Sequence, residues 1–203
     1  MNQLDLIRHL VKVLEELDIP YMIVGSLASG YYGEPRLTRD IDVVADLSYG
    51  HVPKLAEKFP ADEFYFSPEA ARHAIRTHGQ FNIIHPTSGN KIDVITVQDS
   101  LHAETEISRR QRVRILPDQE GYAARAEDVI IAKMRAYSEG GIEKHLRDIA
   151  GIVKVSGEMI DRDYIEKWAA RLGLTDVWHA ILRRATSSDG GVKSWFQVVT
   201  HPS

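Results

Sequence analysis

The sequence predicts an α+β protein, in which a first half of alternating strands and helices precedes a second half of helices alone. Short apolar runs bounded by glycine or proline predict the strands, and these runs end before residue 118. Apolar residues spaced three and four apart predict the helices, which continue alone beyond Pro117. We therefore expect an α/β domain at 1–117, a helical domain at 118–186, and a flexible link and tail at 187–203.

The first half begins with an amphipathic helix, because Leu4, Leu10 and Leu17 belong to an apolar set with helical spacing that ends before Pro20. The same two patterns predict the elements that follow. These are strands at 21–24 and 40–45 with a helix at 26–32 between them, helices at 52–58 and 68–77 separated by a loop with Phe64 and Phe66, a hairpin of strands at 80–85 and 92–97, and an edge strand or arm at 109–116.

The second half is expected to form a bundle of four helices, near 126–139, 143–155, 161–172 and 175–186. The tail beyond them carries Trp195 and Phe196, whose rings can dock on the folded domain. A helical bundle after a mixed sheet fits the α+β class.

Composition excludes several classes of protein. The hydrophobic fraction of 43% and the charged fraction of 27% are those of a soluble globular chain. The net charge of -4 argues against a surface that is basic all over, and the absence of cysteine excludes disulfides, thiolate metal sites and a cysteine nucleophile. The segment MNQLDLIRHL has no basic stretch followed by an uninterrupted apolar core, and no apolar run reaches membrane-spanning length, so we expect a cytoplasmic protein without a membrane partner.

Gly25 and Ser26 lie between a predicted strand and a predicted helix. Glycine lets the backbone approach a ligand closely, and the amides at the start of a helix favour an anion such as a phosphate. Ser26 adds a hydroxyl donor. Alone, this pair is weak evidence for a phosphate site, because most turns of this kind bind no ligand.

Asp40 and Asp42 are two residues apart in the strand predicted at 40–45, so both carboxylates lie on one face of it. Two carboxylates this close repel each other, and a hard divalent cation with oxygen ligands is their natural partner. The alternative is a pair of solvated aspartates at the end of a strand.

Asp93 supplies a third carboxylate, from a second apolar strand that can pair beside the first. Its apolar neighbours indicate a buried setting, where a charged group needs a partner. Three carboxylates from neighbouring strands can hold two metal ions for an in-line phosphoryl displacement.

The segment VGSLASGYYGEPRLTRDIDVV, followed by KIDVI, resembles the nucleotidyltransferase superfamily that includes polymerase beta and the minimal nucleotidyltransferases. The resemblance covers about residues 20 to 97. The set Gly33, Arg36, Thr38, Asp40 and Asp42 is similar to the abortive-infection toxin-like branch and its uncharacterised relatives. The implied fold is a mixed sheet flanked by helices, followed by a C-terminal helical bundle.

The resemblance also implies roles for the residues. Gly25 and Ser26 would bind the β- and γ-phosphates of a nucleoside triphosphate, with Mg²⁺ or Mn²⁺ as cofactor. Asp40, Asp42 and Asp93 would be the catalytic residues and the metal ligands, and Arg36, Thr38 and Lys133 would help to bind the nucleotide. Spacing alone favours a solvated lysine at position 133, and the resemblance makes nucleotide binding an equal alternative.

The implied reaction transfers a nucleoside monophosphate to a hydroxyl or phosphate and releases pyrophosphate. The acceptor stays open among a tRNA end, a protein hydroxyl and a small molecule, and a partner protein or a homodimer is possible. The alternative is a catalytically silent module of the same fold that binds a nucleotide or acts as a toxin-antitoxin partner. The basic run Arg109–Arg114 fits either contacts with RNA phosphates or a solvated strand face.

A phosphatase of the haloacid-dehalogenase type is a weaker reading of Asp40 and Asp42. That family needs an apolar strand directly before the first aspartate, whereas here the polar segment 35–39 precedes it. A glycosyltransferase reading is disfavoured because it leaves Gly25 and Ser26 without a role.

Overall fold

The computed structural model describes residues 1–35, 38 and 40–185. The predicted link and tail at 187–203 therefore lie outside the described residues. None of the helices within these ranges is long and apolar enough to cross a membrane.

The chain divides into two compact units, one of Met1–Leu27 with Leu37–Arg125 and one of Ala28–Arg36 with Ala126–Ser203. The division after Arg125 lies beyond the boundary predicted at residue 117, because strand β7 (Gln119–Ala123) still belongs to the sheet. The prediction of helices alone beyond Pro117 is wrong for this stretch. Its glutamate and glycine are residues that disfavour strands, so the local sequence gives no strand signal.

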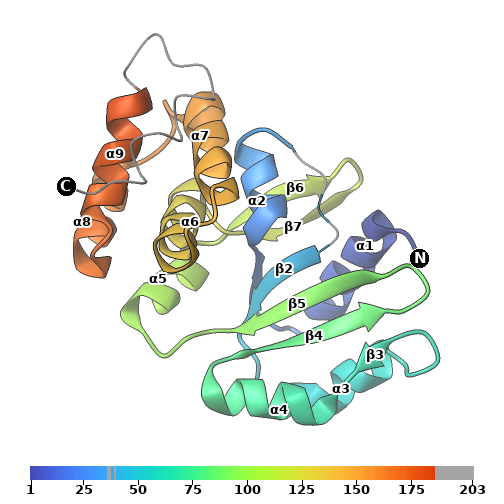
Figure 1. The fold of residues 1–203 in the computed structure, drawn as a ribbon. Coiled ribbons are helices and arrows are strands. Elements are labelled where there is room, and N and C mark those ends of the chain that lie inside the picture. The colour runs from blue at the N-terminus through green and yellow to red at the C-terminus, as the bar shows by residue number, and fades with distance from the viewer. Residues whose placement is uncertain (36–37, 39, 186–203) are drawn as a thin grey trace. The chain divides into compact units, whose positions relative to one another are not determined.

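The first unit is built on one mixed sheet with the strand order β3-β4-β5-β2-β1-β7-β6 (Figure 1). Strand β2 runs parallel to β5, β1 runs parallel to β7, and the other neighbouring pairs are antiparallel. Every strand predicted from the sequence is confirmed, β6 lies at an edge as expected, and β3 is an addition to the predicted loop. The strands besides β7 are β1 (Tyr21–Ile23), β2 (Asp40–Ala45), β3 (Tyr65–Phe66), β4 (Gln80–His85), β5 (Asn90–Thr96) and β6 (Gln111–Leu116).

Four helices lie wholly in the first unit: α1 (Gln3–Glu16), α3 (His51–Lys58), α4 (Pro68–Thr77) and α5 (Leu101–Arg109). The first three were predicted, but α5 was not. Only His102 and Ala103 of α5 are buried, so it lacks the apolar periodicity on which the prediction depends. Its one local signal is Ser100, whose Oγ accepts a hydrogen bond from the amide of Ala103 and caps the helix.

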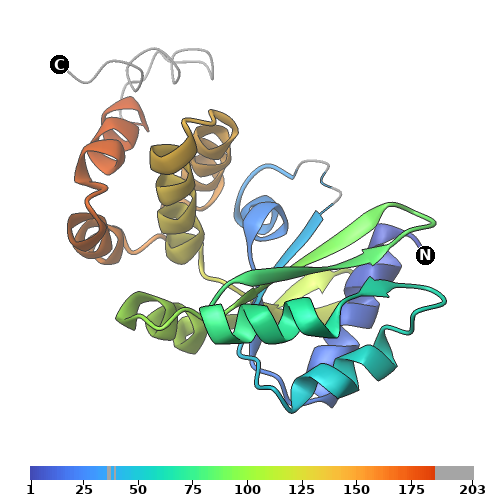
Figure 2. The same ribbon diagram turned by 60° about the horizontal axis from the view of Figure 1, so that its bottom comes forward.

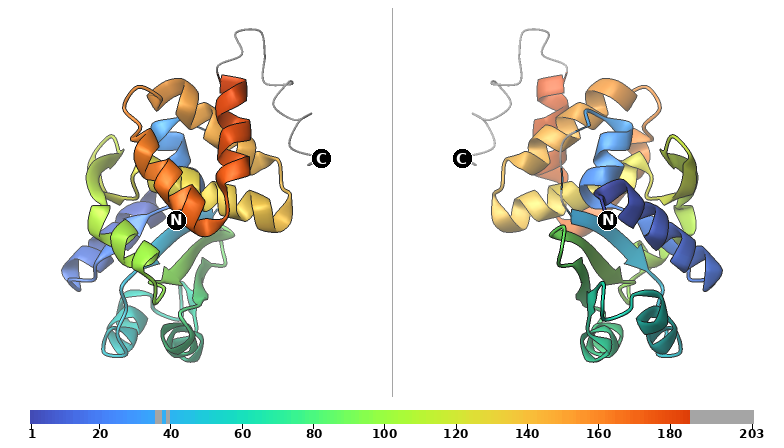
Figure 3. Two further views of the ribbon diagram at one scale, coloured as in Figure 1. Left: turned by 90° about the vertical axis from the view of Figure 1, so that its left-hand side faces the viewer. Right: turned by 90° about the vertical axis from the view of Figure 1, so that its right-hand side faces the viewer.

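The core of the first unit lies on one face of the sheet, where α1, α3 and α4 pack. Figures 2 and 3 show α3 and α4 side by side, and α4 contacts β4 and β5. Ile41 and Val43 of β2 point into this core and are fully buried. Ile92 and Val94 of β5 are buried beside them. Because side chains alternate along a strand, the even-numbered residues of β2 must point to the opposite face.

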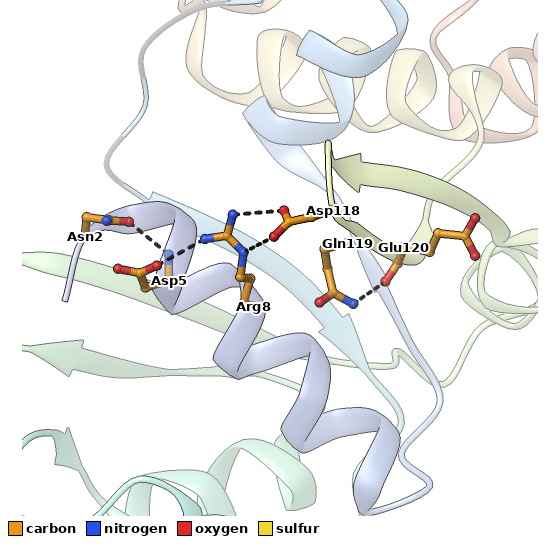
Figure 4. Close-up of polar contacts among 6 residues, drawn as sticks. All are labelled: Asn2, Asp5, Arg8, Asp118, Gln119 and Glu120. Atoms are coloured by element: carbon orange, nitrogen blue, oxygen red, sulfur yellow. Dashed lines mark hydrogen bonds and ion pairs between the residues drawn. The ribbon is translucent and has the colours of Figure 1, made fainter.

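Helix α1 is fixed at its beginning by exposed polar contacts (Figure 4). The side chain of Asn2 accepts a hydrogen bond from the amide of Asp5, which caps the helix. Arg8 donates to both carboxylate oxygens of Asp118, at 2.9 and 3.1 Å, and so joins α1 to the turn between β6 and β7. Such exposed pairs orient elements more than they stabilise them.

The second unit contains α6 (Ala126–Gly140), α7 (Lys144–Ser156), α8 (Arg162–Leu172) and α9 (Thr175–Ala185), which confirm the four predicted helices within a few residues. Helices α6 and α9 each contact the other three helices of this unit. Fully buried side chains fill the space between them, namely Ile130, Met134, Ile149, Ile152 and Ile165.

Gly33 follows α2 (Gly25–Tyr32), whose residues from Ala28 onward belong to the second unit. A Cβ at Gly33 would lie 2.8 Å from backbone atoms of Gly151 and Ile152 in α7, so only glycine permits this close approach. Ser156 supports the same contact by donating to the carbonyl of Tyr32 at 2.6 Å. Gly33, a member of the sequence motif, is therefore a packing residue.

Candidate active site

The three aspartates meet on one face of the sheet. In the parallel pairing of β2 with β5, Asp42 lies directly opposite Asp93, and Asp40 lies opposite Lys91. Paired residues of adjacent strands point to the same face, and neighbouring strands are about 4.8 Å apart. Since Ile41 and Val43 occupy the core face, all three carboxylates project from the other face. The convergence expected from the sequence is therefore present.

The turn after β1 brings Gly25 against this cluster. The amide of Val24 donates to the carbonyl of Asp42 at 2.9 Å, which continues the pairing with β2 one residue beyond the end of β1. Gly25 then turns the chain with φ of +62°, and a Cβ on it would lie 2.0 Å from Oδ2 of Asp42. Both the conformation and the space require glycine at this position.

Helix α2 begins at this turn, with Gly25 and Ser26 as its first two residues. The first amides of a helix have no acceptor within the helix, and the first turn of α2 holds no acidic residue. The start of α2 beside Asp42 is therefore the place where the sequence predicts a phosphate.

The fold of this chain is similar to that of solved nucleotidyltransferase structures. The chain matches the solution structure of the antibiotic-resistance factor ANT(2'')-Ia, a nucleotidyltransferase, with a TM-score of 0.54 and 12% identity, over 87% of this chain and 96% of that one. This chain has a nucleotidyltransferase fold. No family model and no curated protein sequence matches it.

Two other structures of this fold are more distant in shape. The lincomycin-bound lincosamide antibiotic adenylyltransferase LnuA matches with a TM-score of 0.49 and 13% identity, over 77% of this chain and 99% of that one. A nucleotidyltransferase-like protein from Paracoccidioides brasiliensis matches with a TM-score of 0.45 and 20% identity, over 71% of this chain and 72% of that one.

Lys91 and Asn82 are site residues that the sequence analysis did not single out. The ammonium of Lys91 lies 2.8 Å from Oδ2 of Asp93 and 3.8 Å from Oδ1 of Asp40. The amide of Asn82, oriented to donate, lies 2.6 Å from Oδ1 of Asp93. The sequence could have identified Lys91 as a site residue. Side chains alternate along a strand, so a residue two positions before Asp93 must share its face.

Electrostatics at this face of the nucleotidyltransferase fold are dominated by the acids. The hydrogen bond to Asp93 raises the pKa of Lys91 above its ordinary value, and the charges of Asp93, Asp40 and Asp42 add to this effect against the opposing effect of partial burial. Lys91 therefore stays protonated and neutralises part of the acidic cluster.

Thr38, just before β2, takes part in two hydrogen bonds, one through its side chain and one through its carbonyl. The hydroxyl of Thr38 donates to the carbonyl of Asp40 at 3.2 Å, and the carbonyl of Thr38 accepts from the side chain of Gln3 at 2.8 Å. At the start of β5, Asn90 donates to the carbonyl of Met1 at 3.3 Å. Residues 1–3 thus support both strands that carry the aspartates.

For two predicted nucleotide-binding residues, Arg36 and Lys133, the proposed role stays a prediction. Arg36 lies outside the described residues. Lys133 lies in the helical unit, where its ammonium is 2.6 Å from Oδ2 of Asp148 and both side chains are less than a tenth exposed.

The donor set fits a hard divalent cation. Asp40, Asp42 and Asp93 offer only carboxylate oxygens from adjacent strands, which are the ligands that Mg²⁺ and Mn²⁺ prefer. A cation would also relieve the repulsion between Asp42 and Asp93, which lie directly opposite each other. Lys91 supplies part of that compensation in the protein alone.

Proposed function

We propose that this chain transfers a nucleoside monophosphate from a nucleoside triphosphate to a hydroxyl or phosphate acceptor and releases pyrophosphate. The observation that carries the proposal is the pairing of Asp42 with Asp93, with Gly25 packed against the Asp42 carboxylate. The fold shared with ANT(2'')-Ia supports a nucleotide as the donor.

In this proposal, the amides of Gly25 and Ser26 bind the β- and γ-phosphates, and Asp40, Asp42 and Asp93 hold Mg²⁺ or Mn²⁺. The ion, when bound, promotes ionisation of the acceptor and neutralises charge on the leaving group. The acceptor oxygen forms a bond to the α-phosphorus, the bond from that phosphorus to pyrophosphate breaks, and Asp93 takes the acceptor proton.

The remaining predicted residues have supporting roles. Arg36 and Lys133 supply positive charge for the triphosphate, and Thr38 fixes the lead into β2 through its bond to the carbonyl of Asp40. The acceptor is a tRNA end, a protein hydroxyl or a small molecule. ANT(2'')-Ia is an antibiotic-resistance factor, which is the reason to include antibiotics among the small molecules tested.

Labelling tests the proposed activity. The purified protein is incubated with each α-labelled nucleoside triphosphate, Mg²⁺ or Mn²⁺, and a cell extract, with RNA, protein and small-molecule fractions analysed separately. We expect one nucleotide to label one fraction, which identifies donor and acceptor class together. If folded protein labels nothing with any nucleotide, the transfer activity is refuted.

A silent nucleotide-binding or toxin-antitoxin partner module is the second candidate, and the Lys91–Asp93 contact favours it, because a lysine can compensate the acids without a metal ion. Calorimetric titration with ATP and Mg²⁺ separates the two functions when Asp40→Ala is compared with the parent protein. Equal ATP binding in both, independent of Mg²⁺, supports the silent module. Loss of Mg²⁺-dependent binding in Asp40→Ala supports the transferase.

Replacing Gly25 by alanine is expected to lower the transfer rate about 100-fold, because the new Cβ would displace the Asp42 carboxylate and shifts of about 1 Å have effects of this size. Gly173→Ala is the matched control, since Gly173 also has a positive φ, +71°, but nothing within 4 Å of a Cβ. Both variants carry a strain of about 1–2 kcal/mol. Equal transfer rates in the two would show that the space beside Asp42 is irrelevant.

A further inference from the structure

Lys91 holds a carboxylate that the proposed cofactor requires. It lies opposite Asp40 in the strand pairing and two residues before Asp93 on the same face of β5. Its ammonium contacts Oδ2 of Asp93 at 2.8 Å and approaches Asp40 at 3.8 Å. Two adjacent pairs therefore lie on this face. In one, Lys91 is opposite Asp40, and in the other, Asp93 is opposite Asp42.

Both oxygens of Asp93 already have donors. Oδ2 accepts from Lys91, and Oδ1 faces the amide of Asn82 at 2.6 Å. The Asp93 side chain is 17% exposed, so little of it is available from solvent. Each oxygen keeps a second lone pair, but the ammonium of Lys91 lies between the carboxylates of Asp93 and Asp40 and repels a divalent cation there, so the two cations compete for Asp93.

Of the two donors, Lys91 is the one able to move. Asn82 has a short side chain and lies directly opposite Asp93 in the antiparallel pairing of β4 with β5. Lys91 carries its charge on a flexible four-carbon stem, its side chain is 30% exposed, and its strand is only beginning at that point. It can therefore turn to solvent without any change in the backbone.

We infer that Lys91 is an exchangeable counter-ion, which occupies Asp93 in the metal-free protein and is displaced when a divalent cation binds. This inference rests on the proposed function, since it presumes a cation at the three aspartates. It assigns Lys91 two effects: it stabilises the acidic cluster without metal, and it lowers the affinity of the cluster for metal by competition.

Calorimetric titration with Mn²⁺ alone tests the competition. We expect Lys91→Met to bind Mn²⁺ about tenfold more tightly than the parent protein, since a charged hydrogen bond no longer has to be broken. Lys91→Arg keeps the charge and can grip a carboxylate with two donors, so it should bind Mn²⁺ more weakly than the parent. Lys54→Met, which removes an exposed lysine from α3 on the core side of the sheet, should leave the affinity unchanged.

Thermal unfolding supplies a second readout. Without metal, Lys91→Met should unfold at a lower temperature than the parent, because the acids lose their cation, and Mn²⁺ should raise its midpoint by more than it raises that of the parent. If Lys91→Met is too unstable to purify, Lys91→Arg still tests the inference, because unchanged Mn²⁺ affinity in that variant contradicts competition.

The remaining outcomes separate this inference from the proposed function. Unchanged Mn²⁺ affinity in Lys91→Met, with labelled transfer by the parent protein, overturns the exchange and leaves the transferase. Binding of Mn²⁺ by Lys91→Met but not by the parent, without labelled transfer, identifies Lys91 as a permanent counter-ion and overturns both. Absence of Mn²⁺ binding and of transfer in every variant also overturns both.

Discussion

Replacing Asp42 by asparagine is expected to lower the rate of nucleotidyl transfer about 10³-fold, which corresponds to about 4 kcal/mol of transition-state stabilisation. Asp42 is at the centre of the candidate site, because Asp93 lies opposite it and Gly25 lies against its carboxylate. Asparagine keeps the shape of the side chain but removes the charge that a divalent cation requires. The transfer rate from the labelled nucleotide, at saturating Mg²⁺, measures the effect.

The fold should survive this change. Asp42 and Asp93 are like charges on directly paired residues, and such pairs are destabilising. We therefore expect Asp42→Asn to have a thermal midpoint equal to or above that of the parent protein. Asp46→Asn, the same substitution at the exposed residue just beyond the other end of β2, should change neither property. A loss of activity accompanied by unfolding would remove the support that Asp42→Asn gives to a metal site.

Local signals in the sequence predicted most elements of the fold. Strand β2 and helix α4 begin and end at the predicted residues, since β2 has a strong apolar alternation and Pro68 follows the N-cap Ser67. Strand β7 and helix α5 were missed because neither carries a clear apolar period. Elements that owe their structure to neighbours rather than to their own pattern cannot be found in this way.

The candidate site was predicted only in part, because some of its geometry depends on contacts between segments far apart in the chain. Side chains alternate along a strand, so the spacing of Asp40 and Asp42 alone predicts that both lie on one face. The pairing of β2 with β5 is a contact between segments far apart in the chain, so the position of Asp93 opposite Asp42 could only be an expectation. Lys91 was overlooked because its importance depends on that pairing.

Asp148→Ala is expected to reduce the free energy of unfolding by about 3–5 kcal/mol, since it leaves the ammonium of Lys133 buried without this partner. The two groups lie 2.6 Å apart with side chains 7% and 8% exposed, on α6 and α7 of the helical unit. Glu34→Ala is the matched control, because Glu34 and Lys154 are 2.7 Å apart in the same unit but 62% and 72% exposed. Its effect should stay below about 1 kcal/mol, and urea unfolding measures both variants.

Replacing Lys133 and Asp148 together tests the role of Lys133. If the pair is mainly structural, Lys133→Met combined with Asp148→Leu should recover most of the stability lost in Asp148→Ala, because apolar groups of similar size fill the space without a buried charge. A double variant as unstable as the single one would contradict this account of the pair. Nucleotide binding by Lys133 is a separate matter. A stable double variant whose apparent affinity for the nucleotide falls would show that Lys133 also serves the triphosphate, whereas unchanged affinity would restrict Lys133 to the helical bundle.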